Sequence, residues 1–431
     1  MEEKSELKRE LSLVEITLAG IGNILGAGIY VLLGKAAGLA GNLVWLSFLF
    51  AGMTAALSAF SYMELSSMYP RAGAEYEFVK KAFGERIGLF VGLLVVYFVI
   101  ITSSAVALGF GRYFSNLFGV GSLVGAIGLF LFLSLVMVYG IKESAHLAVF
   151  ISLIELSGLL LIIYAGLPHF GTVDYFEAPD LAGLFKASAL IFFAFLGFED
   201  IVRLSQETKD AEKTTPKALL IAISFTVFLY VCVAVAAVSV LDFRVLEHSE
   251  VPLADVAAVA LGNNAFVLLS WIALFSTMNT VLVVMLGGSR IVYGMADTGS
   301  FPKTLARVHP RFRTPWTAIL GIACVSSLFV LLGDITTIVN IANFMIFIVF
   351  FMVNISLIKL RYTEPEKRRP FRVPFSIGRL PLFPFLGALS AVFLCSQISL
   401  EIMAYGFFLI ALGFIIVLLR TRKKPAEPLN I

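Results

Sequence analysis

Long apolar stretches recur along the whole chain, and they constrain its fold more than any other feature. A helix that crosses a bilayer needs about 20 predominantly apolar residues, and 59% of the 431 residues are hydrophobic while 14% are charged. Because lipid offers the backbone no hydrogen-bond partners, such stretches are expected to be helices. Twelve of them can be delimited, at residues 13–38, 43–69, 87–114, 123–139, 147–167, 184–202, 218–241, 265–293, 318–332, 335–360, 382–398 and 402–419. The sequence therefore predicts an all-α integral membrane protein with twelve transmembrane helices.

The distribution of Lys and Arg agrees with this number of spans. Cytoplasmic loops of membrane proteins carry an excess of these residues, and a cytoplasmic N-terminus places 28 of the 32 on the cytoplasmic side. The exceptions are Lys35, Arg112, Lys186 and Arg244. We therefore expect a multi-pass protein of the cell membrane with both termini in the cytoplasm. We expect no cleavable signal peptide, because the charged residues 1–10 lead into a full-length span.

Glycines interrupt the first predicted span near its centre, where Gly20, Gly22, Gly26 and Gly28 fall within nine residues. Each interior Gly costs a helix about 1 kcal/mol relative to Ala, so this span is expected to break at bilayer depth. A broken span offers free amides to an anion and free carbonyls to a cation. The alternatives are close helix packing through Gly22 and Gly26 and a dinucleotide-binding loop, which the absence of a βαβ pattern disfavours.

The sixth predicted span contains a second interruption, five spans after the first. Gly197 is followed closely by Glu199 and Asp200 inside an apolar stretch, which makes a poor continuous helix. Inverted repeats are expected to be interrupted at corresponding positions. The chain then divides into an N-terminal head (1–12), a first five-helix repeat (13–167), a second repeat (184–360), two extra helices (380–420) and a tail (421–431).

Residue patterns typical of other chemistries are missing from the sequence. The cysteines lie singly within apolar spans, and the histidines fall at loops or span ends without a metal-binding cluster. These residues are Cys232, Cys324, Cys395, His146, His169, His248 and His309. We expect no metal, no cofactor, no nucleic-acid partner and no enzymatic activity. A secondary transporter explains the paired interruptions; a channel would need a ring of charges or a filter, and a membrane enzyme a catalytic constellation.

Five segments resemble the amino acid, polyamine and organocation (APC) superfamily of transporters. The family's first-helix signature is similar to GNILGAGI at 22–29. Its second-span motif is similar to YMEL, PRAGAEY and AFG, which lie between residues 62 and 84. In this second motif, Ala74 stands where a second Gly is usual. The sixth-span motif is matched by FAFLGFE at 193–199 with ETKD at 207–210 and Pro216. A fourth segment resembles the end of the family's eighth span and consists of SR at 289–290, Tyr293, MAD at 295–297 and Pro302. The fifth segment is RPFRVP at 369–374. Together the five segments extend the resemblance over nearly the whole chain.

This resemblance implies the leucine-transporter fold, in which two inverted five-helix repeats move amino acids or related amines by alternating access. It implies that the substrate carboxylate meets the backbone amides of Gly26, Ala27 and Gly28. The carbonyls that would meet the substrate ammonium are those of Ile24, Phe193 and Leu196. Phe193 matches the gating aromatic that covers the substrate, with simple packing as the alternative interpretation.

Glu155 departs from the resemblance, because many relatives carry at this place in the fifth span a Lys that helps to couple transport to protons. An ionisable residue inside a span is a candidate functional residue. Glu155 is expected either to bind the coupling proton or to hold Na⁺ together with hydroxyls of the eighth span, such as those of Ser276, Thr277 or Thr280. A carboxyl group that only hydrogen-bonds between helices is the third possibility.

Other polar residues within the spans give weaker hypotheses. Glu64 and Arg290 are expected near the cytoplasmic ends of the second and eighth spans, as part of a gate or of an ordinary salt bridge. Glu199 and Asp200 either steer a cationic substrate or cap a half-helix. The candidate pocket groups are Asn340, Asn343, Thr102, Ser103 and Ser104.

The apolar lining around the sixth span favours a neutral amino acid as the substrate, taken up with protons. This lining consists of Phe192, Phe193, Phe195 and Phe198. The alternative is Na⁺-coupled or exchange transport of cationic amino acids or polyamines, with Glu155 or Glu199 as the counter-charge. The sequence leaves the coupling ion, the choice between import and exchange, and the oligomeric state open.

Overall fold

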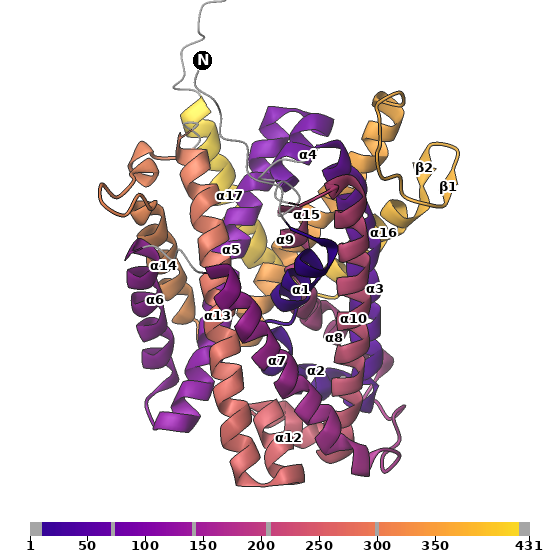
Figure 1. Cartoon of the computed structure of the whole chain (residues 1–431), viewed down its shortest axis with the longest axis vertical. Helices are drawn as coiled ribbons and strands as arrows, with labels where there is room; N and C mark the ends of the chain where they lie inside the picture. Colours follow the sequence, from indigo (N-terminus) through magenta and orange to yellow (C-terminus); the bar gives the residue numbers. More distant parts are fainter. Residues whose placement is uncertain (1–10, 70–73, 140–143, 204–207, 298–300, 422–431) are drawn as a thin grey trace, which may run out of the picture.

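The computed structural model describes residues 11–69, 74–139, 144–203, 208–297 and 301–421, and this part of the chain is a bundle of helices with one small hairpin (Figure 1). The α-helices are α1 (Leu13–Ile24), α2 (Gly28–Ala40), α3 (Val44–Met68), α4 (Ala74–Phe83), α5 (Glu85–Phe118), α6 (Ser122–Tyr139), α7 (Ser144–Gly166), α8 (Leu181–Ile191), α9 (Phe198–Arg203), α10 (Ala211–Val240), α11 (Phe243–His248), α12 (Pro252–Leu261), α13 (Asn263–Asp297), α14 (Trp316–Val330), α15 (Ile335–Thr363), α16 (Leu382–Ser396) and α17 (Leu400–Thr421). The 3-10 helices are η1 (Gly41–Leu43), η2 (Leu167–His169), η3 (Phe192–Phe195) and η5 (Lys303–Ala306), and strands β1 (Ser376–Ile377) and β2 (Leu380–Pro381) pair antiparallel.

Helices occupy all twelve apolar stretches delimited in the sequence. By length and composition, eight helical segments of the described residues are able to cross a membrane, or nine if α16 and α17, which meet at 112°, form one broken span. Helices α1, α12 and α14 are apolar but shorter. The prediction of an all-α, multi-pass membrane protein is confirmed, while twelve crossings and the division into repeats stay predictions.

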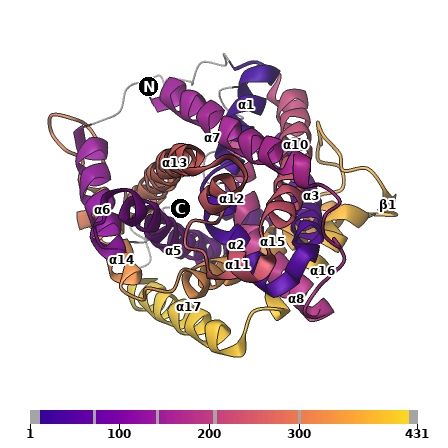
Figure 2. The same ribbon diagram turned by 90° about the horizontal axis from the view of Figure 1, so that it is seen from below.

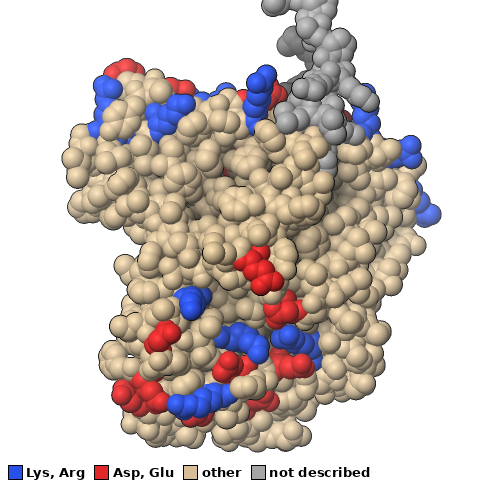
Figure 3. Space-filling view, turned by 180° about the vertical axis from the view of Figure 1, so that it is seen from behind, with Lys and Arg blue, Asp and Glu red and all other residues tan. Residues whose placement is uncertain are grey.

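The surface is that of a protein surrounded by lipid. On the face shown in Figure 3, Lys, Arg, Asp and Glu lie along the upper end and over the lower half of the molecule, with an almost uncharged belt between the two groups. Peripheral helices also expose large apolar side chains, among them Leu131 (66% exposed) and Leu135 (62%) on α6 and Phe228 (69%) on α10. Such exposure would be unfavourable in water and is expected where acyl chains cover the helices.

The two predicted interruptions lie against each other in the interior. Helix α1 ends at Ile24 and α2 begins at Gly28, while α8 passes through η3 to an extended Leu196 before α9 begins at Phe198. An added Cβ on Gly28 would lie 2.5 Å from the Cα of Ala194, and one on Gly197 would lie 2.6 Å from the carbonyl oxygen of Asn23. Gly197 also has φ of +109°, which only Gly adopts readily. Both glycines are therefore needed for the breaks to touch.

Helix caps and turns agree with local sequence. Ser12 and Glu15 form a reciprocal capping box at the start of α1, which satisfies two of the otherwise unpaired amides. Gly333 takes a positive φ of +74° in the tight turn between α14 and α15. Asp334 then caps α15 by accepting hydrogen bonds from the amides of Thr336 and Thr337.

Three further helices lie in segments that hydropathy predicts as loops. Helix α4 lies at the upper end of the molecule in Figure 1, and α11 and α12 lie at the lower end beneath α2 (Figure 2). Their 10, 6 and 10 residues are too few to register as spans. The ends of the bundle are therefore partly covered by short helices.

Candidate functional site

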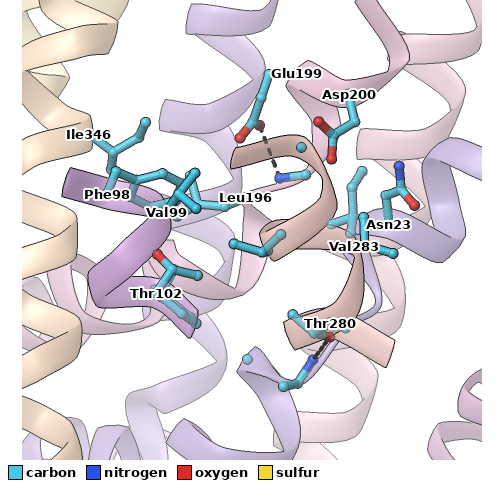
Figure 4. Close-up of a pocket in the computed structure, with 18 of the residues that line it drawn as sticks. Asn23, Phe98, Val99, Thr102, Leu196, Glu199, Asp200, Thr280, Val283 and Ile346 are labelled. Atoms are coloured by element: carbon cyan, nitrogen blue, oxygen red, sulfur yellow. Dashed lines mark hydrogen bonds between the residues drawn. The ribbon is translucent and has the colours of Figure 1, made fainter. Parts of the chain in front are cut away.

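A cavity lies where the two helix breaks meet. Its walls come from both breaks and from the facing sides of α5 and α13, with Ile346 of α15 and Glu75 of α4 completing them (Figure 4). All six residues that the resemblance assigns to the substrate line this cavity, namely Ile24, Gly26, Ala27, Gly28, Phe193 and Leu196. Residues far apart in the sequence are thus brought to one place, and their role in binding substrate stays a prediction.

Gly26, Ala27 and Gly28, at the start of α2, line the cavity. Ala27 donates its N–H to the Oγ1 of Thr280 at 3.0 Å, so this amide is already engaged. The amides of Gly26 and Gly28 have no acceptor among the described residues. The N-terminus of a helix carries a partial positive charge and unpaired N–H groups, and α2, with 13 residues, is long enough to provide both. This end of the cavity suits an anion.

Three further residues of the two breaks, Ile24, Phe193 and Leu196, line the same cavity. The carbonyl of Ile24 accepts a 2.8 Å hydrogen bond from the hydroxyl of Tyr230 on α10, and that of Phe193 accepts a 3.3 Å bond from the amide of Leu196. No donor to the Leu196 carbonyl is found in the described part of the chain. A carbonyl oxygen can accept two hydrogen bonds. The carbonyl oxygens of Ile24, Phe193 and Leu196 can therefore each still bind a cation.

The remaining walls are apolar on one side and acidic at one end. Phe98 and Val99 of α5, Val283 of α13 and Ile346 face the centre (Figure 4). Three carboxylate residues, Glu75, Glu199 and Asp200, also line the cavity. The carboxylate of Glu199 accepts the amide of Gly197 at 2.9 Å, as expected for a group that caps α9.

Glu155 lies outside the cavity, on α7. It is fully buried, and neither side-chain oxygen makes a hydrogen bond within the described structure. Ser276 and Asn279 of α13 are the polar side chains that face it, and the Oγ of Ser276 is also without a partner. Asn279 therefore both faces Glu155 and lines the cavity.

The other predicted ion ligands do not gather at Glu155. Thr280 bonds to the amide of Ala27 and to the carbonyl of Ser276, and Thr277 bonds within its own helix to Ala273 and Leu274. Of the hydroxyl groups named for Na⁺, only that of Ser276 faces the carboxyl group of Glu155.

Glu64 and Arg290 do not pair with each other in this structure. Glu64, on α3, is fully buried and accepts hydrogen bonds from Arg361, Arg369 and the amide of Val373. Arg290 is exposed and forms no ion pair with Glu64. Glu64 instead holds the segment after α15, which contains the RPFRVP motif, against α3.

The weaker pocket hypotheses have mixed outcomes. Asn343 donates to the carbonyls of Ala189 and Leu190 at 2.7 and 3.0 Å, so it supports the end of α8 rather than the cavity. Ser103 and Ser104 bond to carbonyls one turn earlier in α5, whereas Thr102 lines the cavity. Residues 70–73 and Glu207 of the quoted motifs, and the side chain of His146, lie outside the described part of the structure.

Sequence reasoning missed several residues in or beside the cavity. Asn279 lines the cavity and Tyr230 binds the Ile24 carbonyl beside it, and neither was proposed, although a Tyr or Asn inside an apolar span needs a polar partner. This need for a polar partner was the signal in the sequence that could have identified Tyr230 and Asn279. Phe98, Val283 and Ile346 gave none, because apolar residues in a span look alike whether they face lipid, another helix or a cavity.

Comparison with known proteins decides the family, since the family model described as "Amino acid permease" matches residues 11–419. The chain belongs to the amino acid permease family. This permease is 30% identical to the branched-chain amino acid permease BcaP of Bacillus subtilis, over 98% of its own length and 94% of that protein. It is also 30% identical to a methylthioribose transporter of B. subtilis (97% and 94% covered) and 31% to cationic amino acid transporter 4 of Mus musculus (84% and 61%). The protein is therefore an amino acid transporter of the APC superfamily and not an enzyme.

Proposed function

We propose that this permease binds a neutral amino acid between the two helix breaks and transports it by alternating access. The observation that carries the proposal is the pairing of free amides at Gly26 and Gly28 with a free carbonyl at Leu196 around one cavity. A zwitterion needs an anion site and a cation site a few ångströms apart. Helix ends supply both as fixed partial charges, without the cost of burying charged side chains.

The apolar walls favour a neutral side chain. Phe98, Val99, Val283 and Ile346 would surround the substrate side chain, and such a surface binds apolar groups through the hydrophobic effect. Phe193, which is 7% exposed and lies in η3, would cover the substrate during the occluded step. The similarity to a branched-chain amino acid permease supports the same substrate class.

A cationic amino acid is the second candidate substrate, and the acidic end of the cavity favours it. Glu75, Glu199 and Asp200 line that end, and a long cationic side chain could reach toward them. The similarity to a cationic amino acid transporter supports this alternative. Uptake of labelled L-leucine and L-lysine into proteoliposomes, each competed by the other, separates the two. Saturable leucine uptake that lysine does not compete supports the neutral substrate; the reverse pattern would overturn it.

We propose that Glu155 couples transport to protons. An ionised carboxylate without partners is costly to bury, so Glu155 is expected to carry a proton, or to hold a cation, whenever its surroundings are closed as they are here. Asn279 and Ser276 connect it to the cavity and to α13. Movement of the helix breaks during transport would then change the access of Glu155 to water.

Two measurements distinguish the coupling ions. Glu155→Gln should abolish substrate-driven proton uptake into proteoliposomes while amino acid counterflow, which needs no net coupling, persists. Replacement of Na⁺ by choline should leave uptake by the native protein unchanged. If uptake in the Glu155→Gln variant still rises with an imposed pH gradient, Glu155 is not the proton site, and a requirement for Na⁺ would favour a Glu155–Ser276 sodium site instead.

We also propose that the permease lies in the cell membrane with both termini in the cytoplasm and twelve crossings. The distribution of Lys and Arg supports this orientation. Single cysteines placed at Lys186 or Arg244 should react with an impermeant reagent added to whole cells, while one at Lys213 should not. If only the cysteine at position 213 is labelled, the orientation in the membrane is the reverse of the proposed one.

A further inference from the structure

We propose that Thr102 selects among neutral substrates by hydrogen-bonding to a hydroxyl group on the substrate side chain. The permease would then bind threonine more tightly than valine, which has the same shape but carries a methyl group in place of the hydroxyl. This inference deepens the proposed function and rests on it.

The hydroxyl of Thr102 differs from those of its two neighbours. Ser103 and Ser104 donate to the carbonyls of Val99 and Ile100 at 2.8 and 2.7 Å, the usual way in which hydroxyl groups are satisfied inside a helix. The Oγ1 of Thr102 has no partner in the described structure, although the residue is only 4% exposed. Buried polar atoms are nearly always hydrogen-bonded, so an exception calls for a ligand or an ordered water.

Thr102 faces the cavity from the wall opposite the break between α1 and α2. Val95, Phe98, Val99 and Thr102 all line the cavity, and their spacing puts them on one side of α5. In Figure 4, Thr102 lies across the cavity from Thr280, whose hydroxyl holds the amide of Ala27. The breaks provide the backbone groups that bind the substrate carboxylate and ammonium. The substrate side chain is therefore expected to contact the wall formed by α5.

The surroundings of Thr102 on this wall make its hydroxyl selective. Phe98, Val99 and Ile346 offer no hydrogen bond to a substrate hydroxyl, so Thr102 is its candidate partner on this side of the cavity. When substrate excludes water, an unpaired hydroxyl on either molecule carries a desolvation penalty. A site that hydrogen-bonds a substrate hydroxyl therefore discriminates against an analogue that lacks it.

The test compares the dissociation constants of L-threonine and L-valine for purified full-length protein and for Thr102→Val, which keeps the shape of the side chain. The native protein should prefer threonine. The substitution should lower the ratio of threonine to valine affinity by roughly three- to tenfold, through weaker binding of threonine. An unchanged ratio, or equal weakening of both amino acids, would overturn the inference.

Two matched variants keep the test decisive. Ser103→Ala removes a hydroxyl that bonds within α5 and should leave the ratio unchanged. Thr102→Ser should retain the preference for threonine and Thr102→Ala should lose it, which settles the question if Thr102→Val does not fold. If the native protein binds neither amino acid, the proposal of a neutral substrate fails together with this inference; binding with an unaltered ratio overturns the role of Thr102 alone.

Discussion

The hydroxyl of Tyr230 on α10 donates a 2.8 Å hydrogen bond to the carbonyl of Ile24, the last residue of α1. Both residues are almost completely buried. A helix that ends inside a membrane leaves carbonyl groups without partners, and Tyr230 satisfies one of them from a helix about 200 residues away in the sequence. The break in the first span is thus stabilised by a side chain from another helix.

Removal of this hydroxyl should destabilise the permease. Tyr230→Phe leaves the Ile24 carbonyl without this donor, at a cost of about 1–3 kcal/mol, and should lower the melting temperature of the purified protein. Tyr164→Phe alters a residue that is 64% exposed and should have no effect. Equal melting temperatures for the two variants would show that the bond contributes nothing to stability.

Thr280→Val should also destabilise the protein, because it removes the acceptor of the Ala27 amide. The expected loss is again about 1–3 kcal/mol, measured as a lower melting temperature without substrate. Thr277→Val is the matched control, since the Thr277 hydroxyl bonds only within α13. A larger effect at Thr277 than at Thr280 would contradict the role assigned to Thr280.

Gly28→Ala should reduce transport at least tenfold, because the new methyl group would approach the Cα of Ala194 to 2.5 Å and push the breaks apart. The measurement is initial uptake into proteoliposomes at a fixed amount of folded protein. Gly128→Ala, on α6, places its methyl group in open space and should transport normally. Normal uptake by Gly28→Ala would mean that contact between the breaks is not required.

Glu64→Gln should be among the most destabilising single substitutions. The carboxylate of Glu64 is bound by Arg361 and Arg369, and all three side chains are at most 8% exposed. Loss of one partner of a buried ion pair costs about 3–5 kcal/mol. The control Glu364→Gln breaks a pair with Lys367 in which both side chains are 37% exposed, and should cost at most about 1 kcal/mol. Similar melting temperatures for both variants would contradict this ranking.

Much of this architecture can be predicted from the sequence, because the bilayer constrains it strongly. Apolar stretches locate the helices, since every backbone group within lipid needs an internal partner. Gly26, Gly28 and Gly197 locate the breaks, because glycine weakens helices and permits close contact. These local signals, together with the resemblance, predict six residues for the substrate site, and all six line the cavity that the structure contains.

The contacts between helices could not be predicted in the same way. Hydropathy indicates that Glu64 and Arg290 lie near span ends, but not which residues they face, and the partners of Glu64 turned out to be Arg361 and Arg369. Thr102 resembles Ser103 and Ser104 in sequence. Only the packing of α5 shows that Thr102 lines the cavity without a partner for its hydroxyl in the described structure, while the hydroxyls of Ser103 and Ser104 donate to carbonyls of α5 and, for Ser104, also to that of Ser326.

The position of the carboxylate in an experimental structure with a bound amino acid tests the central proposal most directly. We expect both carboxylate oxygens at the start of α2, within about 3 Å of the amide nitrogens of Gly26 and Gly28, and the ammonium near the carbonyl of Leu196. An amino acid bound away from the two breaks, or bound with its ammonium at the start of α2, would contradict the proposal.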